Sequence, residues 1–178
     1  WDDHDCTNDT DRTFPLMGPA RQAFKEYWPV RAAEGAGDSM YRSFSWGSLV
    51  DTFVMDCRTF RDPKTDPNKP GKTMLGAAQK PWLKDALKAS TAPFKLLVSS
   101  IPFLAPFEDA SWFGYAAERD ELKAFFASEV KGRVTILSGD FHCAWHLEDP
   151  EHRLNEIIAG PLGAWPFQEI KKPFVKAD

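Results

Sequence analysis

The spacing of apolar residues predicts helices and strands that alternate along most of the chain. Apolar positions that recur every three or four residues indicate amphipathic helices at 19–28, 76–90 and 116–130. Short apolar and β-branched runs indicate strands, and the first two, separated by Gly47 and Ser48, are typical of a hairpin. The predicted strands span 40–46, 49–55, 94–99, 133–138 and 154–159. This alternation predicts an α/β fold.

The composition fits one domain with its own hydrophobic core. The chain has 178 residues, of which 43% are hydrophobic and 13% aromatic. The net charge is −4, and acidic and basic residues are mixed along the sequence without a basic stripe, so we expect no nucleic-acid-binding module. No apolar run approaches the roughly 20 residues that a transmembrane helix needs.

The first residues, WDDHD, include neither an initiator Met nor a charged-then-apolar leader, and we interpret the chain as a fragment or processed product of a larger protein. This beginning gives no information on localisation. The three cysteines, Cys6, Cys57 and Cys143, form no Cys-x-x-Cys pair. They fit free thiols, or one disulfide and one free thiol, and leave the compartment open.

Polar clusters follow several predicted strands. Gly139, Asp140, Phe141 and His142 come directly after the strand at 133–138, and the residues at 56–58 and 99–100 follow two others. If these strands are parallel, their carboxyl ends meet at one edge of the sheet, which is where ligands bind in open α/β sheets. The carboxylate of Asp140 and the imidazole of His142 suit Zn, Mn or Fe better than an all-oxygen Ca site.

The acidic start of the chain allows two interpretations. Three carboxylates within residues 2–5 repel one another unless water or a cation screens them. The run is either a solvated turn, or a site in which Asp3 binds metal and His4 acts on the substrate as an acid or an electrostatic clamp. Arg58 likewise allows two interpretations: its guanidinium either binds an anion or ties its loop to Asp62 or Asp56.

Taken together, these motifs resemble those of the PhoD-like (alkaline phosphatase D) family of metallophosphoesterases. The matching segments cover nearly the whole chain and occur in the order of the family. They are WDDHD at 1–5 with Asn8 and Asp9, VMDCRTFRD at 54–62, Leu75 and Gly76 with Gln79, Trp82 and Leu83, SSIP at 99–102, Trp112 with Glu118 and Arg119, and LSGDFH at 137–142.

The resemblance implies the C-terminal portion, residues 1–178, of a single metallophosphoesterase-like α/β/β/α sandwich that is incomplete at its N-terminus. It implies hydrolysis of phosphate mono- or diesters at a binuclear centre of Fe, Zn, Mn or Ca ions. Asp3, Asp140 and His142 would be metal ligands, and His4 and Arg58 would act on the phosphate. The remaining ligands would come from an upstream segment or another chain, and the protein would be exported.

The other candidates are weaker. His146 and His152 are expected in polar loops, and each cysteine is more simply a small buried residue than a metal ligand. Six aromatic side chains are expected in the core: Trp28, Trp46, Phe53, Trp82, Phe125 and Phe126. Phe103, Phe107, Trp112 and Trp165 either pack in the core or wall a substrate pocket, and Trp112 is our candidate for substrate binding.

Two other functions remain open at this stage. The same scaffold would serve a hydrolase of a different ester, which would keep the metals and ignore phosphate esters. It would also serve a non-catalytic subunit without a complete metal centre.

Overall fold

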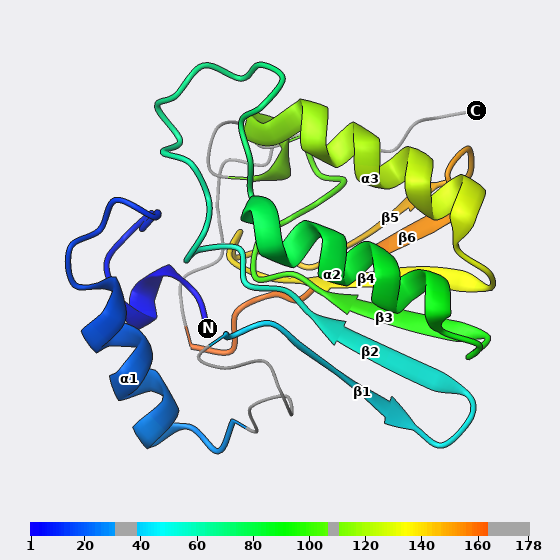
Figure 1. The fold of residues 1–178 in the computed structure, drawn as a ribbon, viewed down its shortest axis with the longest axis horizontal. Coiled ribbons are helices and arrows are strands. Elements are labelled where there is room, and N and C mark those ends of the chain that lie inside the picture. The colour runs from blue at the N-terminus through cyan, green and yellow to red at the C-terminus, as the bar shows by residue number, and fades with distance from the viewer. Residues whose placement is uncertain (31–38, 107–110, 164–178) are drawn as a thin grey trace.

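The computed structural model describes residues 1–30, 39–106 and 111–163. Within them it has three α-helices, two short 3-10 helices and six strands (Figure 1). In chain order these are η1 (Asp3–Asp5), α1 (Met17–Tyr27), β1 (Arg42–Trp46), β2 (Val50–Val54), α2 (Gly76–Ala89), β3 (Phe94–Val98), η2 (Trp112–Tyr115), α3 (Ala116–Glu129), β4 (Arg133–Ser138), β5 (Trp145–Asp149) and β6 (Leu154–Ile158).

The strands form one mixed sheet in the order β1-β2-β3-β4-β6-β5. The four inner strands are parallel, and β1 and β5 are antiparallel edge strands. The predicted hairpin, helices and strands are therefore confirmed, with ends shifted by one or two residues. The sheet also confirms the α/β class, and the parallel strands place their carboxyl ends at one edge.

One strand was missed. The sequence favoured a loop around His146 because Asp149 and Pro150 are typical turn residues, but β5 runs up to Asp149 and the turn starts only at Pro150. The five residues of β5 pair antiparallel with β6. Their side chains alternate between partly buried and exposed positions, as expected for an edge strand.

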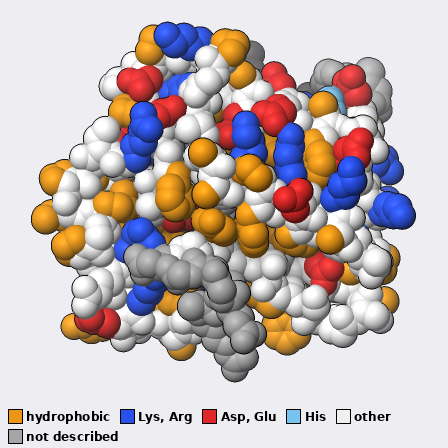
Figure 2. Space-filling view, in the orientation of Figure 1, with side chains coloured by type: hydrophobic (Ala, Val, Ile, Leu, Met, Phe, Trp, Pro, Cys, Tyr) orange, Lys and Arg blue, Asp and Glu red, His pale blue; other side chains and the backbone are white. Residues whose placement is uncertain are grey.

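Helices α2 and α3 cover one face of the sheet (Figure 1). Leu83 and Leu87 of α2 and Leu122 of α3 belong to the same buried cluster as Phe53 and Ile136 from the strands. On the outer side of these helices, Figure 2 shows basic and acidic side chains close together. Lys80 and Lys84 both form ion pairs with Glu121, so this surface has mixed charge.

The opposite face of the sheet is only partly covered. The strand register places Trp46, Phe94 and Ile157 on the face opposite Phe53, and these three side chains are exposed. The expectation that Trp28 and Trp46 are core residues was wrong, because they are 59% and 67% exposed. Phe53 and Phe126 are core residues as predicted, and Trp82 and Phe125 pack against the core while partly exposed.

Two buried glutamates connect loops to this framework. Glu118 accepts hydrogen bonds from the backbone N–H groups of Met74 and Leu75 and from the Thr73 hydroxyl. Glu156 accepts them from Phe103 N at 2.7 Å and Leu104 N at 2.6 Å, and from Ser138 Oγ at 2.6 Å. Both carboxylates therefore satisfy loop N–H groups that would otherwise be buried without a partner.

Candidate metal centre

Three carboxylates meet at the carboxyl edge of the parallel strands. Asp140 follows β4, while Asp2 and Asp3 belong to the N-terminal segment, which lies beside this edge (Figure 1). One carboxylate oxygen from each of the three lies within 4.8 Å of the others. The expectation that the start of the chain and the turn after β4 come together is confirmed for Asp3 and Asp140.

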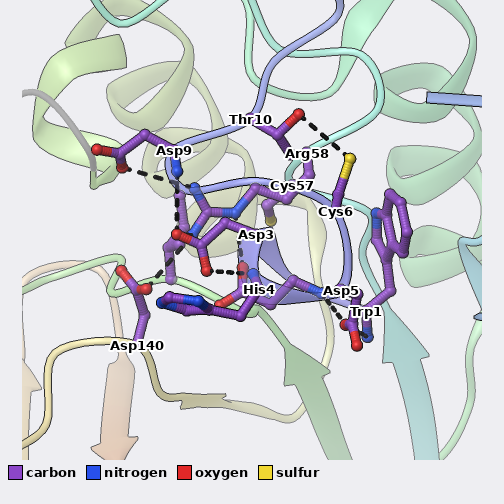
Figure 3. Close-up of polar contacts among 12 residues, drawn as sticks. Trp1, Asp3, His4, Asp5, Cys6, Asp9, Thr10, Cys57, Arg58 and Asp140 are labelled. Atoms are coloured by element: carbon purple, nitrogen blue, oxygen red, sulfur yellow. Dashed lines mark hydrogen bonds and ion pairs between the residues drawn. The ribbon is translucent and has the colours of Figure 1, made fainter. Parts of the chain in front are cut away.

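Arg58 provides the positive charge at this site. It follows β2, is fully buried, and its Nε donates to Asp2 Oδ1 at 2.6 Å. Its Nη2 lies 3.4 Å from Asp140 Oδ1 and 3.8 Å from Asp3 Oδ2, and its Nη1 lies 4.0 Å from Asp9 Oδ1 (Figure 3). The guanidinium therefore faces carboxylates and does not tie its loop to Asp62 or Asp56.

The turn that carries Arg58 is fixed by Asp56. Oδ1 of Asp56 accepts hydrogen bonds from the backbone N–H groups of Arg58 at 3.1 Å and Thr59 at 2.9 Å, and from Trp1 Nε1 at 3.0 Å. Gln79 of α2 bonds both the N–H and the C=O of Asp56. Asp56 thus attaches the N-terminal segment and the Arg58 turn to the helical layer.

Asp3 is held by its own loop. It is 4% exposed, and its two oxygens accept the backbone N–H groups of His4 at 2.8 Å and Asp9 at 3.1 Å. Arg61, also fully buried, holds the same loop by donating to the carbonyls of Thr10 at 2.8 Å and Asp9 at 2.7 Å. The position of the Asp3 carboxylate is therefore set by backbone contacts.

Backbone strain is concentrated at the site. Four described non-glycine residues have a positive φ, and three of them are Asp9 at 55°, Asp140 at 68° and His142 at 47°. Asp and His adopt this left-handed conformation more readily than most non-glycine residues, although it still costs free energy relative to the ordinary backbone regions. Such strain is typical of turns that aim side chains at a ligand.

The electrostatics of the cluster are those of crowded acids around one base. Burial, followed by the charges of Asp2 and Asp3, raises the pKa of Asp140 to about 6, while the charge of Arg58 opposes the shift. Burial alone would lower the pKa of Arg58, but the attraction of Asp2, Asp140 and Asp3 outweighs burial and raises it. One buried guanidinium therefore compensates only part of the negative charge.

Neither His4 nor His142 is one of the three residues of the carboxylate group. His4 is exposed, and Figure 3 shows its imidazole extended toward Asp140. His142 is partly buried in the same turn as Asp140, but it is not one of the three residues of the group. His146 is an exposed residue of β5, as its expected polar position implies, although it lies on a strand.

The expectation that Trp112 lines a substrate pocket needs correction. Trp112 is fully buried in η2, its ring centroid lies 4.9 Å from that of Phe103, and its Nε1 donates to Ser99 Oγ at 3.3 Å. Packing, the alternative interpretation, is the one observed for Trp112 and Phe103. Phe107 and Trp165 lie outside the described residues.

All three cysteines are free thiols, which excludes the disulfide alternative for this structure. Cys57 is fully buried, with its Sγ 3.6 Å from Ser99 Oγ. Burial raises the pKa of Cys57 to about 11, and the contact with Ser99 opposes this shift. The Cys57 side chain is therefore a protonated core residue here.

Asp2 and Asp9 are site residues that the sequence analysis did not single out. Asp2 stands in the recognised acidic run, and Asp9 in the matched Asn8-Asp9 pair, so the signal was present. Which carboxylates turn inward depends on η1, where Asp2 N donates to Asp5 Oδ2 at 2.8 Å. That hydrogen bond occupies Asp5 at the exposed end of the run.

A second acidic group, Asp149 with Glu151 and His152, lies at the other end of the sheet. Asp149 already pairs with Lys123 at 2.7 Å and with His152 Nδ1 at 3.0 Å. Beside it is a hollow of about 530 Å³, lined by residues such as Gly132, Asp149 and Leu154. This hollow is at the amino ends of the parallel strands, away from Asp140.

The model of the family described as "PhoD-like phosphatase" matches residues 1–177. Alkaline phosphatase D of Bacillus subtilis (strain 168) is 30% identical, over 82% of this chain and 30% of its own length. A solved structure titled "Structure of PhoD" matches with a TM-score of 0.80 and 27% identity, over 90% of this chain and 38% of that one. The chain thus spans about a third of the length of these relatives, and it belongs to the PhoD-like phosphatase family.

Proposed function

We propose that this chain forms part of a metal-dependent phosphoesterase that hydrolyses phosphate mono- or diesters at a binuclear centre. The observation that carries the proposal is the meeting of Asp2, Asp3 and Asp140 at the carboxyl edge of the sheet, around a buried arginine. Membership of the PhoD-like phosphatase family supports the substrate class.

The donor set fits metal ions. Carboxylate oxygens are hard ligands that suit Ca²⁺, Mn²⁺ and Fe ions, and burial strengthens their attraction for a cation. Asp3 and Asp140 are our primary ligands, and Asp2 joins them because its carboxylate lies in the same group. His142 is proposed as a further ligand because it shares the strained turn with Asp140.

A binuclear centre needs more ligands than these residues supply. We infer that the others come from residues outside the 178, on a second sheet that covers the exposed face of the present one. Two observations support this: Trp46, Phe94 and Ile157 leave an apolar surface on that face, and the chain spans only 38% of the PhoD structure. The complete fold would then be the α/β/β/α sandwich.

The reaction divides between the metals and the side chains of this chain. Bound metal ions would neutralise the phosphate and make water a stronger nucleophile. Arg58 would stabilise charge on the phosphate oxygens through its parallel N–H donors. His4 has an exposed imidazole on the Asp140 side of the cluster, from which it would donate a proton to the leaving oxygen.

Metal analysis combined with an ester assay tests this proposal. We expect the full-length protein, which includes the residues outside the 178 that complete the centre, to contain stoichiometric metal and to hydrolyse p-nitrophenyl phosphate or its diester. Asp140→Asn should lose the metal and reduce kcat/KM by on the order of 10³-fold, because it removes one anionic ligand. Glu151→Gln, which removes a carboxylate from the second acidic group, is the matched control and should change neither.

The other outcomes separate the competing functions. Metal without hydrolysis of any phosphate ester would favour a hydrolase of another ester. A protein without stoichiometric metal would favour the non-catalytic subunit and contradict the proposal.

A further inference from the structure

The guanidinium of Arg58 contacts the same three carboxylates that form the candidate metal centre. We propose that Arg58 is a resident cation of this site, which holds the carboxylates together in the metal-free protein and competes with metal ions for them. The inference rests on the proposed function, since it requires these carboxylates to bind metal. It adds a competition between the protein's own cation and the metal, and hence a control on metal loading.

The contact distances indicate a guanidinium shared among anions. An arginine paired with one carboxylate usually makes two parallel hydrogen bonds of roughly 2.7–2.9 Å. Arg58 makes one short bond, from Nε to Asp2, while Nη2 lies 3.4 Å from Asp140 and 3.8 Å from Asp3. Nη2 is therefore near the two main predicted metal ligands without binding either of them tightly.

Burial and an unused donor support the same interpretation. The Arg58 side chain is fully buried, and its Nη1 donates no hydrogen bond among the described residues, although it lies 4.0 Å from Asp9 Oδ1. If Arg58 had only a structural role, each N–H donor of its buried guanidinium would be expected to make a hydrogen bond. The free donor of Arg58 faces an acidic cluster and is available to another anion.

Arg61 shows the alternative arrangement three residues along the chain. It is equally buried, but its Nε and Nη2 donate to the backbone carbonyls of Thr10 and Asp9. Arg61 therefore holds a loop, whereas Arg58 neutralises side-chain charge. The segment after β2 therefore contains one arginine that binds backbone carbonyls, Arg61, and one that binds carboxylates, Arg58.

Competition follows from charge. A divalent cation among the carboxylates of Asp2, Asp3 and Asp140 neutralises more negative charge than one guanidinium does, but it must first displace the attraction of Arg58. With a metal ion bound by these carboxylates, the donors of Arg58 would be free to bind an anionic group of the substrate. Metal loading and substrate binding would then be coupled through one side chain.

Titration of the chelator-treated protein with Mn²⁺ alone tests this inference, with calorimetry for affinity and thermal unfolding for stability. Arg58→Gln should bind Mn²⁺ at least about tenfold more tightly than the wild type, because a charge-assisted competitor is gone. In chelator its melting temperature should be several degrees lower, since the carboxylates repel one another. Saturating Mn²⁺ should close that gap.

Two further variants keep the test informative. Lys64→Gln is the control for net charge, because Lys64 pairs with Asp9 at 2.6 Å and contacts none of the three carboxylates, so its affinity should stay within about twofold. Arg58→Lys keeps the charge with fewer contacts, and its Mn²⁺ affinity should fall between those of wild type and Arg58→Gln. If Arg58→Gln does not fold, the Mn²⁺ affinity of Arg58→Lys alone tests the competition.

The contradicting results are distinct. If the Arg58 variants bind Mn²⁺ as weakly as the wild type, or more weakly, the competition is refuted while the proposed metal centre stands. If neither the wild type nor any variant binds Mn²⁺ or another divalent ion, the proposed function itself fails.

Discussion

Two regions of this molecule contain buried or partly buried carboxylates, and the two regions satisfy these carboxylates differently. Glu156 accepts three short hydrogen bonds, two from backbone N–H groups and one from a hydroxyl, with no cation in contact among the described residues. Asp140 has one polar contact among the described residues, the 3.4 Å approach of Arg58, and the like charges of Asp2, Asp3 and Asp9 raise its pKa. Glu156 is saturated, and Asp140 is not.

The difference separates a structural carboxylate from one available to a ligand. A saturated acceptor has no lone pair to offer and holds the loops that donate to it. An unsaturated carboxylate beside other carboxylates raises the free energy of the metal-free fold and lowers it again when a cation binds. The two kinds of carboxylate should therefore respond in opposite ways to substitution.

The largest stability effect is expected at Glu156. Glu156→Ala leaves the N–H groups of Phe103 and Leu104 buried without an acceptor, so the free energy of unfolding should fall by about 3 kcal/mol. Urea unfolding measures this loss. Glu148→Ala, on the exposed side of β5, should change it by under about 0.5 kcal/mol. A loss below about 1 kcal/mol for Glu156→Ala would contradict the structural role given to this carboxylate.

A smaller, pH-dependent effect is expected at Asp149. Burial would raise the pKa of Asp149, but the hydrogen bonds from Lys123 and His152 lower it to about 2. A carboxyl whose folded pKa lies below its ordinary value stabilises the fold above that value and loses its contribution as the pH falls through the folded pKa. Asp149→Asn should therefore cost about 1–2 kcal/mol at pH 6, and the cost should shrink as the pH falls from about 4 to 2.

Urea unfolding of wild type and Asp149→Asn at several pH values measures that cost. A difference that is constant over this range would show that Lys123 and His152 do not lower the pKa of Asp149.

The smallest stability effect is expected at Asp140. In chelator, Asp140→Asn should change the free energy of unfolding by less than about 1 kcal/mol, or raise it, because it removes repulsion from Asp2 and Asp3. Thermal and urea unfolding at pH 7 measure the change. A loss as large as that of Glu156→Ala would place Asp140 among the structural carboxylates.

Periodicity was enough to predict most of the fold. The helices and inner strands have long apolar patterns, whereas β5 has five residues, two of them charged at neutral pH, and ends at a turn signal. Trp28 and Trp46 were misplaced because residue type alone does not tell which face of an element is covered. Trp112 was misplaced because η2 turns an apparent loop residue into the core.

The site was predicted in part for a similar reason. The family resemblance predicted that Asp3 and Asp140 share a site, but the partners of the Arg58 guanidinium were sought nearby, at Asp56 and Asp62. The observed partners Asp2 and Asp140 are 56 and 82 residues away in the sequence. Such pairs depend on the tertiary fold, and local spacing carries no information about them.

The central claim is that Asp2, Asp3 and Asp140 form a cation site. An anomalous difference map from crystals grown with Mn²⁺ tests it most directly, because it locates the ion itself. We expect a peak in contact with carboxylate oxygens of Asp3 and Asp140, with the Arg58 guanidinium displaced from them. A map with a peak only at Asp149, Glu151 and His152, or with none in the protein, would contradict this account.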